Sequence, residues 1–333
     1  MSWRPRNPQS AFASKLLYPL RGGKNSKPFY FIKCTLRELV PNVLCRAWAE
    51  KLIEAGFKKF NRIDIFDRVD YYNKLLQPTL LSKDAPELSK QRMEAKAQVY
   101  YFDTREYTRY FPQNLHWRHL PGDITYIPAE PTIVKSRPIA GDNANGVLLN
   151  LNKVRHFLFV DDAIPFEKKK TIAVFRGKVR NKPKRIALFK KHFDNPLCDF
   201  GDTSGHSSDP DAWKTEKMTI REQLGYKFIL AVEGNDVASN LKWVMSSNAI
   251  AMMPKPEFET WFMEGRLIPN VHYIELAPDF SDLGEKIHYY SEHTDAAHTI
   301  IENAHTYVQQ FQNPERERLI SLLVMKKYFA LTN

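Results

Sequence analysis

The stretch from Lys227 to Gly265 constrains the fold most, because two short apolar runs flank a segment with helical character. The first run is Phe228–Val232 and the second is Ala249–Met253, both short enough for strands buried on two faces. The intervening segment carries capping residues and apolar positions at helical spacing, namely Ser239, Asn240, Leu241, Val244 and Met245. The order strand, turn, helix, strand predicts the parallel crossover of nucleotide-binding α/β domains.

Such a crossover is suited to an anion. Free backbone N–H groups at the helix start face outward at the carboxyl end of the strand, where a phosphate can bind. Glu233 and Gly234 end the first apolar run at this point, and Lys242 falls one turn into the predicted helix. The alternative is an ordinary buried crossover with a solvated lysine.

A second strand-to-loop switch precedes this one. The β-rich run Thr171–Phe175 meets Arg176-Gly177-Lys178, and a helix is predicted to begin near Arg185. Basic side chains there can neutralise a pyrophosphate, and arginine can do so with two parallel hydrogen bonds. A run of charge is also typical of a solvated face, but two such switches in one half of the chain favour an anion site.

The length of 333 residues suits two domains of moderate size. We place the boundaries at 1–165, 166–310 and 311–333, with the charged run 167–170 as a connector and the last segment a helix that packs back toward the first domain.

The composition favours a globular protein with anionic partners. No apolar run approaches the roughly 20 residues that span a bilayer, and the N-terminus lacks the apolar core of a signal peptide. The cysteines Cys34, Cys45 and Cys198 include no CxxC pair, which argues against a disulfide framework or zinc site and indicates a cytoplasmic location. The net charge of +11 is compatible with nucleic acid, an acidic membrane surface or a nucleotide-linked substrate.

Apolar patterning predicts the remaining elements. The predicted strands are Phe29–Ile32, Val99–Phe102, Ile133-Val134, Val147–Leu151, Phe157–Val160 and Val271–Ile274. The predicted helices are Ala11–Leu17, Leu44–Ala55, Arg68–Leu76, Met218–Leu224, Leu283–Ser291, Asp295–Gln310 and Leu319–Leu331, and Asp199–Asp211 is predicted to be a loop.

Two acidic positions can carry chemistry. Asp123 follows the Pro121-Gly122 turn and precedes the basic cluster around Lys135, so its carboxylate is a candidate general base or, alternatively, a turn cap. The pair Asp161 and Asp162 can hold a divalent metal or cap the turn before Pro165. We favour the cap, because a metal site needs more oxygen ligands than the sequence places there.

Taken together and in order, several motifs resemble glycosyltransferase family 90. They are PGDITYIPAEPTIVKSRPI at 121–139, LNKVRHF at 151–157, AVFRG at 173–177, NPLCDFG at 195–201, the stretch 227–265 and VHYIEL at 271–276. The resemblance covers roughly the last two thirds of the chain and is closest to the bacterial lipopolysaccharide-modifying branch.

The resemblance implies a GT-B-like α/β architecture, with an acceptor-side and a nucleotide-sugar-binding Rossmann-like domain separated by a cleft. It implies inverting transfer from a UDP-sugar to a lipopolysaccharide core or other surface glycan, with no metal or other cofactor. Asp123 matches the catalytic base, with Asp103 as the fallback. Positions that match the donor-binding residues are Arg176, Gly177, Lys178, Arg185, Glu233, Gly234, Ser239, Asn240 and Lys242.

One departure from the family pattern concerns the donor site. Animal members carry an arginine just after the matching serine, whereas only Lys242 is available here. The animal members' secretory signal is absent, which fits an enzyme in the cytoplasm or at the inner face of the cytoplasmic membrane. The rival hypotheses are a metal-dependent transferase that uses Asp161 and Asp162, and a non-enzymatic binder of nucleic acid or an anionic surface.

Overall fold

The computed structural model describes residues 23–205 and 209–333, which form a mixed α/β structure with parallel sheets. The larger sheet has five strands in the order β10-β8-β7-β5-β6, and every neighbouring pair is parallel. Its strands are β5 (Lys170–Gly177), β6 (Cys198–Asp202), β7 (Tyr226–Leu230), β8 (Ile250–Met253) and β10 (Ile274–Glu275).

The predicted crossover is confirmed. Strands β7 and β8 are parallel neighbours joined through α9 (Leu241–Met245). Alternate residues of β7 enter different cores, with Phe228 and Leu230 packed on one face and Ile229 on the other, as the two-residue period of a strand requires. The strand is therefore buried on both faces, but α9 is only 5 residues long and its macrodipole is correspondingly small.

A smaller parallel sheet lies in the first half of the chain. It has the order β1-β2-β4, from β1 (His119–Leu120), β2 (Thr132–Val134) and β4 (Gly146–Leu148). The next strand, β3 (Ser136–Pro138), pairs antiparallel with β9 (Phe258–Thr260) from the second half. This two-stranded sheet joins the two halves.

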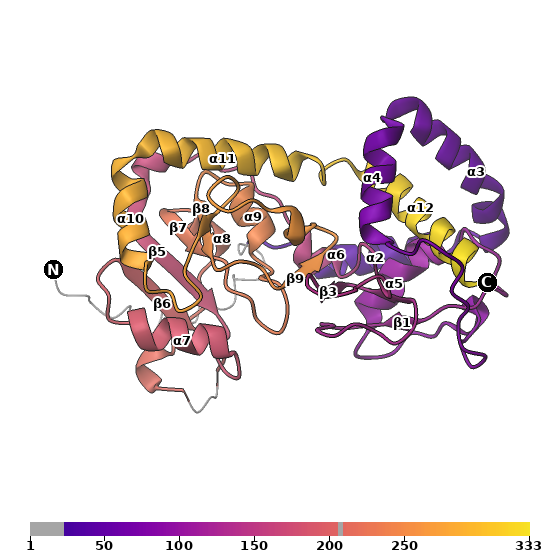
Figure 1. Cartoon of the computed structure of the whole chain (residues 1–333), viewed down its shortest axis with the longest axis horizontal. Helices are drawn as coiled ribbons and strands as arrows, with labels where there is room; N and C mark the ends of the chain where they lie inside the picture. The colour runs from indigo at the N-terminus through magenta and orange to yellow at the C-terminus, as the bar shows by residue number, and fades with distance from the viewer. Residues whose placement is uncertain (1–22, 206–208) are drawn as a thin grey trace.

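Helices cover both sheets (Figure 1). The α-helices are α2 (Lys27–Glu38), α3 (Asn42–Lys59), α4 (Arg62–Tyr72), α5 (Gln98–Thr108), α6 (Lys153–His156), α7 (Pro183–His192), α8 (Ile220–Gln223), α10 (Leu283–Glu292), α11 (Thr294–Gln309) and α12 (Pro314–Thr332). Short 3-10 helices occupy Leu88–Lys90, Phe166–Lys168, Asp211–Trp213 and Glu264–Arg266. Within the described residues, no helix is both long and apolar enough to cross a bilayer.

The chain end returns to the first half of the molecule. In Figure 1, α10 and α11 lie along the larger sheet, and α12 continues from them to the group formed by α3 and α4. Helix α12 packs against α3, α4 and α5.

Two predicted strands are wrong, because both segments are helical. Phe29–Ile32 lies in α2, where the Ser26 side chain accepts from Phe29 N and Pro28 occupies the first turn. Val99–Phe102 lies in α5, whose buried positions recur around Asp103 and Tyr107 at helical spacing. In both cases the β-prone apolar run is overridden by capping or by tertiary packing.

Two further segments differ from expectation. Phe157–Val160 has no strand partner and forms an extended connection, in which Val160 N donates to the Ser246 hydroxyl. The predicted loop Asp199–Asp211 begins inside β6. The helix predicted at Ala11–Leu17 lies outside the described residues.

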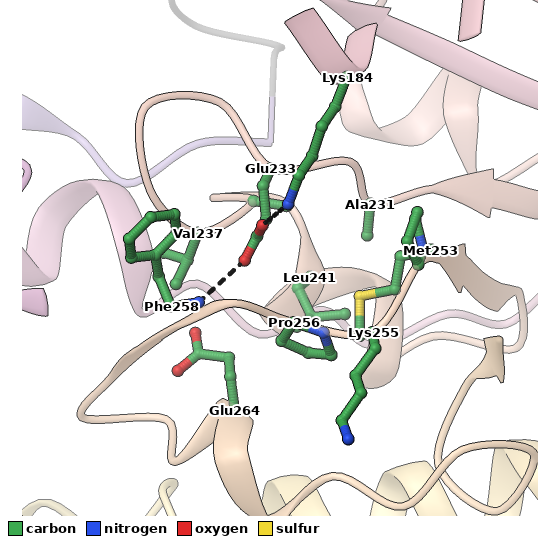
Figure 2. A pocket seen from close by; sticks show the side chains of 12 residues that line it. Lys184, Ala231, Glu233, Val237, Leu241, Met253, Lys255, Pro256, Phe258 and Glu264 are labelled. Atoms are coloured by element: carbon green, nitrogen blue, oxygen red, sulfur yellow. Dashed lines mark hydrogen bonds and ion pairs between the residues drawn. The ribbon is translucent and has the colours of Figure 1, made fainter. Parts of the chain in front are cut away.

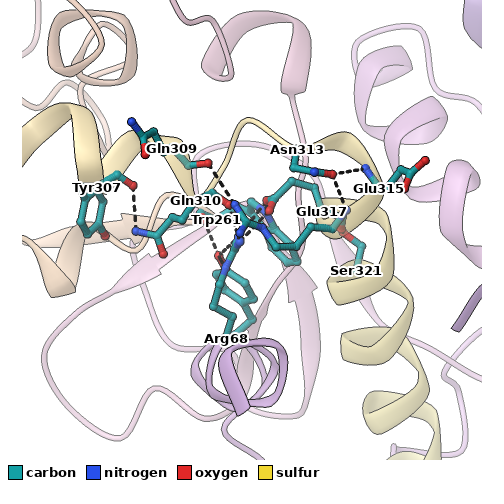
Figure 3. Close-up of polar contacts among 11 residues, drawn as sticks. Arg68, Trp261, Tyr307, Gln309, Gln310, Asn313, Glu315, Glu317 and Ser321 are labelled. Atoms are coloured by element: carbon teal, nitrogen blue, oxygen red, sulfur yellow. Dashed lines mark hydrogen bonds and ion pairs between the residues drawn. The ribbon is translucent and has the colours of Figure 1, made fainter. Parts of the chain in front are cut away.

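A buried polar cluster fastens α12 to α4. Arg68 on α4 forms an ion pair with Glu317 on α12 at 2.6 Å, and their side chains are 6% and 9% exposed. The indole N–H of Trp261 donates to the same carboxylate at 2.6 Å, and the Trp261 ring stacks on Tyr72 with centroids 3.8 Å apart. Figure 3 shows Arg68, Trp261 and Glu317 converging where the chain passes from α11 to α12. This cluster therefore anchors the final helix to the first half of the molecule.

We predict that Glu317→Gln lowers the free energy of unfolding by about 3–5 kcal/mol, because it leaves the buried Arg68 charge without its partner. The matched control is Glu315→Gln on the same helix, where the ion pair with Lys59 is exposed to solvent and its loss should leave the stability almost unchanged. Urea denaturation measures both values. Equal losses for the two variants would contradict the role given to the buried pair.

Candidate functional site

The larger sheet contains a topological switch point. Strand β5 lies between β6 and β7, so the chain leaves β5 toward one side and later crosses to the other. Ligands of open α/β sheets bind in the crevice at the carboxyl ends of strands at such a point. Gly177 ends β5 here, and Glu233 and Gly234 follow β7.

Arg185, in the first turn of α7, bridges this switch point. Its guanidinium donates to the Val232 carbonyl at 2.8 Å beyond β7 and to the Lys178 carbonyl at 2.8 Å beyond β5. A Cβ at Gly234 would lie 3.1 Å from the guanidinium, so glycine permits this close approach. These partners are carbonyls and carry no full negative charge, so the arginine keeps an uncompensated positive charge at the carboxyl ends of both strands.

A second arginine reaches the same region from the smaller sheet. Arg155 lies on α6, which follows β4, and its charge acts on both Arg185 and Asp123. Burial and the proximity of Arg155 lower the pKa of Arg185 to about 10, so Arg185 stays charged at neutral pH. Arg155 is exposed and forms no ion pair with the described residues. Together the two arginines make a positive region open to an anion.

Asp123 lies opposite these groups, on the loop after β1. One carboxylate oxygen accepts from the ammonium of Lys135 at 2.5 Å, and the other accepts from the Asn235 side-chain amide at 2.9 Å. Lys135 also pairs with Asp236 at 2.7 Å and is only 2% exposed. Because Lys135 follows β2 while Asn235 and Asp236 follow β7, these contacts bring the carboxyl ends of the two parallel sheets together.

The surroundings keep Asp123 ionised. Burial opposes its charge, but the Lys135 ammonium and hydrogen bonds from Lys135 and Asn235 outweigh that effect and hold the pKa of Asp123 below its usual range. The pKa of Lys135 is raised, because attraction to Asp236, Tyr100 and Asp123 exceeds the effect of its burial. At neutral pH the site therefore contains a carboxylate held by an ammonium.

Among the predicted donor residues around β7, Glu233 lines a pocket at the carboxyl ends of β7 and β8 (Figure 2), whereas Gly234, Ser239, Asn240 and Lys242 are not among its lining residues. Glu233 pairs with Lys184 at 2.5 Å and accepts from the backbone N–H of Glu257 at 2.9 Å. Burial raises the pKa of Glu233 in spite of these partners. Figure 2 shows Glu233 between Lys184 and Phe258, on the wall of the pocket. Its carboxylate thus serves to hold the loop after β8 against α7.

Other predicted donor residues have local partners. Arg176 pairs with Asp199 on the neighbouring strand β6, at 2.5 Å. The Asn240 side chain donates to the Leu230 carbonyl at 2.9 Å and so fixes the turn between β7 and α9. Lys178 is exposed at the rim, and Ser239 is half-buried at the start of α9. Arg176 and Asn240 are therefore engaged within the protein, whereas Lys178 lies open to solvent.

Lys242 lies away from solvent. Its side chain is 0% exposed, and its ammonium pairs with Glu264 at 2.5 Å, next to the Phe262 ring. Glu264 also accepts from the backbone N–H of Thr260 at 2.6 Å. In this conformation the lysine faces the interior and fastens α9 to the segment after β9, and its amine does not face an open groove.

The alternative carboxylates have structural partners. Asp103 is buried in α5, where it accepts from Tyr30 Oη at 2.8 Å and from Lys153 N at 3.1 Å, and burial raises its pKa. Asp162 accepts from Lys169 Nζ at 2.7 Å and from Ile164 N at 3.1 Å. Of the predicted pair, Asp162 is the residue that caps the turn before Pro165, through the hydrogen bond from Ile164 N.

Several residues of the site were not predicted from the sequence. Asn235 and Asp236 directly follow the Glu233-Gly234 turn, and Arg155 and His156 lie within the motif LNKVRHF, so their positions beside recognised motifs were the available signal. His156 is 2% exposed, and neither ring nitrogen has a hydrogen-bond partner in the described part of the chain. Burial, with the nearby charges of Lys242, Lys135 and Arg155, holds the pKa of His156 well below its usual value. The ring is therefore neutral, and its two nitrogens are buried without a hydrogen-bond partner among the described residues.

We predict that Lys242→Met destabilises the fold by about 3–5 kcal/mol, because Glu264 would keep a buried charge without its counterion. The control is Lys255→Met, which removes an exposed lysine from the rim of the pocket in Figure 2. Chemical denaturation monitored by circular dichroism gives the difference. A stable Lys242→Met protein would argue that the lysine is held for ligand binding instead.

Comparisons with known proteins show the family to which the chain is related. The model of glycosyl transferase family 90 matches residues 151–330. The O-glucosyltransferase LpsA of Dichelobacter nodosus is 41% identical over 314 residues, which cover 92% of this chain and 98% of that protein. Human protein O-glucosyltransferase 3 is 25% identical over 161 residues, or 47% of this chain and 31% of that protein.

The family match includes both loops of the switch point and the arginine-bearing helix α6, and the bacterial relative matches along almost the whole chain. The chain belongs to glycosyltransferase family 90.

Proposed function

We propose that this protein is an inverting glycosyltransferase that moves a sugar from a UDP donor to an acceptor hydroxyl, in a GT-B-like cleft between the two parallel sheets. The observation that carries the proposal is the contact between Asp123 and Asn235, which sets a carboxylate from one sheet against the switch point of the other. Family membership supports the reaction class.

The donor diphosphate binds at the switch point in this proposal. Arg185 and Arg155 supply positive charge there, and the glycines Gly177 and Gly234 leave the backbone close to the ligand. Lys178 lies open at the rim, and Ser239 offers a hydroxyl at the start of α9. The departing UDP is thus stabilised by fixed cations, which act on the charge that develops as the glycosidic bond breaks. Lys242 contributes indirectly, through the ion pair that positions α9.

The base acts from the opposite side. An inverting displacement requires the acceptor hydroxyl to attack the face of the sugar opposite the leaving group, so base and diphosphate site must come from different parts of the cleft. Asp123 meets this requirement, because it follows β1 while Arg185 follows β5. The Asp123 oxygen that accepts from Asn235 is the one we assign to the acceptor proton. The acceptor hydroxyl would then donate to the same oxygen as Asn235 or replace the Asn235 hydrogen bond.

The names of the relatives suggest the sugar. Both are named O-glucosyltransferases, so we propose glucose as the transferred sugar. For the acceptor we propose a hydroxyl of a lipopolysaccharide core or other surface glycan, as the resemblance of the sequence motifs implies. We place the enzyme on the cytoplasmic side of the membrane, a location compatible with a UDP-sugar donor. The metal-dependent alternative gains no support from Asp162, because its oxygens are already bonded to Lys169, Ile164 and Asn248.

We predict that Asp123→Asn lowers the transfer rate by about 10²–10⁴-fold while UDP still binds, because the amide keeps the size of the side chain but cannot accept the proton. The rate is measured with UDP-glucose and an isolated surface-glycan acceptor, and UDP binding by calorimetry. Since Lys135 retains Asp236 as a partner, the fold should persist. Transfer at the wild-type rate would reject Asp123 as the base.

We predict that Arg185→Gln weakens UDP binding by at least tenfold, because it removes the charge that spans the carboxyl ends of β5 and β7. Lys190→Gln is the matched control, since it removes an exposed cation from the same helix. Calorimetric titration with UDP distinguishes the two variants, and thermal unfolding shows whether either has lost structure. An unchanged dissociation constant in a folded Arg185→Gln protein would rule out this diphosphate site.

A further inference from the structure

Helix α2 turns an apolar face outward. Phe29, Ile32 and Leu36 are 68%, 58% and 60% exposed, and their spacing of three and four residues sets them on one face of the helix. A helix on the surface of a soluble protein ordinarily buries this stripe. Here the stripe faces away from the protein.

Polar contacts on the opposite side of α2 explain why its apolar stripe faces outward. Tyr30 donates to Asp103 at 2.8 Å, and Arg37 pairs with Glu106 at 2.6 Å, so polar groups join α2 to α5. Glu38 adds a further ion pair, with Arg105 on α5 at 3.2 Å. Figure 1 places α2 beside α5. The helix cannot roll to bury its apolar stripe without breaking these contacts.

More large apolar side chains are exposed at the end of α2 and in the first two turns of α3. Leu39, Val43, Leu44 and Trp48 are 75%, 65%, 44% and 47% exposed. We call these residues, together with Phe29, Ile32 and Leu36, the α2–α3 face. A succession of seven large exposed apolar side chains over twenty residues is unusual for a soluble surface, and such surfaces mark interaction sites.

The charged residues next to the α2–α3 face indicate the kind of partner that it binds. Lys27 and Lys33 on α2 are exposed and form no ion pair within the described ranges 23–205 and 209–333, whereas Glu38, the acidic residue of α2, is paired with Arg105. An apolar face that carries phenylalanine and tryptophan and is flanked by lysines has the chemistry of a helix lying in the interface of a membrane. A second copy of this chain would bring like charges together, since each copy carries a net charge of +11. Anionic lipid headgroups complement the same charges.

We propose that the α2–α3 face inserts into the surface of an anionic lipid membrane and holds the protein there. The position of α2 suits the function proposed above. Asn25, just before α2, donates to the Val154 carbonyl of α6 at 3.3 Å, and α6 carries Arg155 beside Asp123. The membrane surface would thus lie next to the cleft, and a lipid-linked glycan could present its hydroxyl to Asp123.

The test is sedimentation of the full-length protein with phosphatidylcholine vesicles that either contain or lack phosphatidylglycerol. We expect binding to the phosphatidylglycerol vesicles at low salt, with loss on the order of a hundredfold in Ile32→Glu/Leu36→Glu, because two apolar side chains no longer enter the lipid. Lys27→Gln and Lys33→Gln should each weaken binding roughly fivefold, and only on vesicles with phosphatidylglycerol.

The matched control is Leu76→Glu/Leu80→Glu, which adds the same charges at leucines that are 90% and 76% exposed elsewhere on the surface. This control should bind vesicles like the wild type. Failure of the wild type to sediment with phosphatidylglycerol vesicles, or equal loss in both double variants, would overturn the proposal. So would dimerisation in sedimentation velocity that Ile32→Glu/Leu36→Glu abolishes while vesicle binding is unchanged.

The membrane proposal rests on the proposed function for the position of the acceptor, but different variants test the two proposals. Ile32→Glu/Leu36→Glu should keep UDP binding, because neither residue lies at the switch point, and Asp123→Asn should keep vesicle binding. Loss of UDP binding in a folded Ile32→Glu/Leu36→Glu protein would instead place the α2–α3 face at the nucleotide site.

Discussion

The ammonium of Lys135 is the contact on which the arrangement of the site depends. It binds Asp123 at 2.5 Å and Asp236 at 2.7 Å, so one buried cation holds a carboxylate from the loop after β1 and another from the loop after β7. Burying a charge costs free energy unless the charge is paired, and the Lys135 ammonium is paired with two carboxylates. The two loops are therefore fixed relative to each other before any ligand arrives. The antiparallel pair of β3 and β9, and the passage of α12 into the first half, support the same alignment.

The charged groups at the carboxyl ends of the two parallel sheets differ in their chemistry. On the side of the smaller sheet, Asp123 stays ionised because Lys135 stabilises its negative charge. On the side of the larger sheet, Arg185 is bonded to carbonyl groups, and no carboxylate of residues 23–205 or 209–333 pairs with it, so its charge is available to an anion. A reaction that removes a proton on one side and releases a diphosphate on the other needs this separation. The same fold without these residues would have no such capacity, since fold alone does not determine function.

The sequence predicted the second half of the fold well and the first half poorly, for a physical reason. The central strands β7 and β8 of the larger sheet are buried on both faces, so continuous apolar runs such as Phe228–Val232 identified them directly. The edge strand β6 lacks such a run and was missed. In the first half, Val99–Phe102 is also a short run of apolar and aromatic residues but folds as part of α5, because the buried positions around Asp103 and Tyr107 follow a helical period that a four-residue run does not reveal. The site shows the same contrast. Asp123 and the turn at Gly234 could be found from motifs, whereas the buried partner of Lys242 lies 22 residues away and is set by tertiary packing. The pairing of Lys135 with Asp236 likewise depends on how the two sheets meet.

The most direct measurement is a crystal structure of the protein with UDP and a glycan acceptor bound. The account predicts that the diphosphate lies against Arg185 at the carboxyl ends of β5 and β7, with the acceptor hydroxyl within hydrogen-bond distance of Asp123 across the cleft. A diphosphate bound elsewhere, or an acceptor hydroxyl that approaches from the same side as the diphosphate, would contradict it.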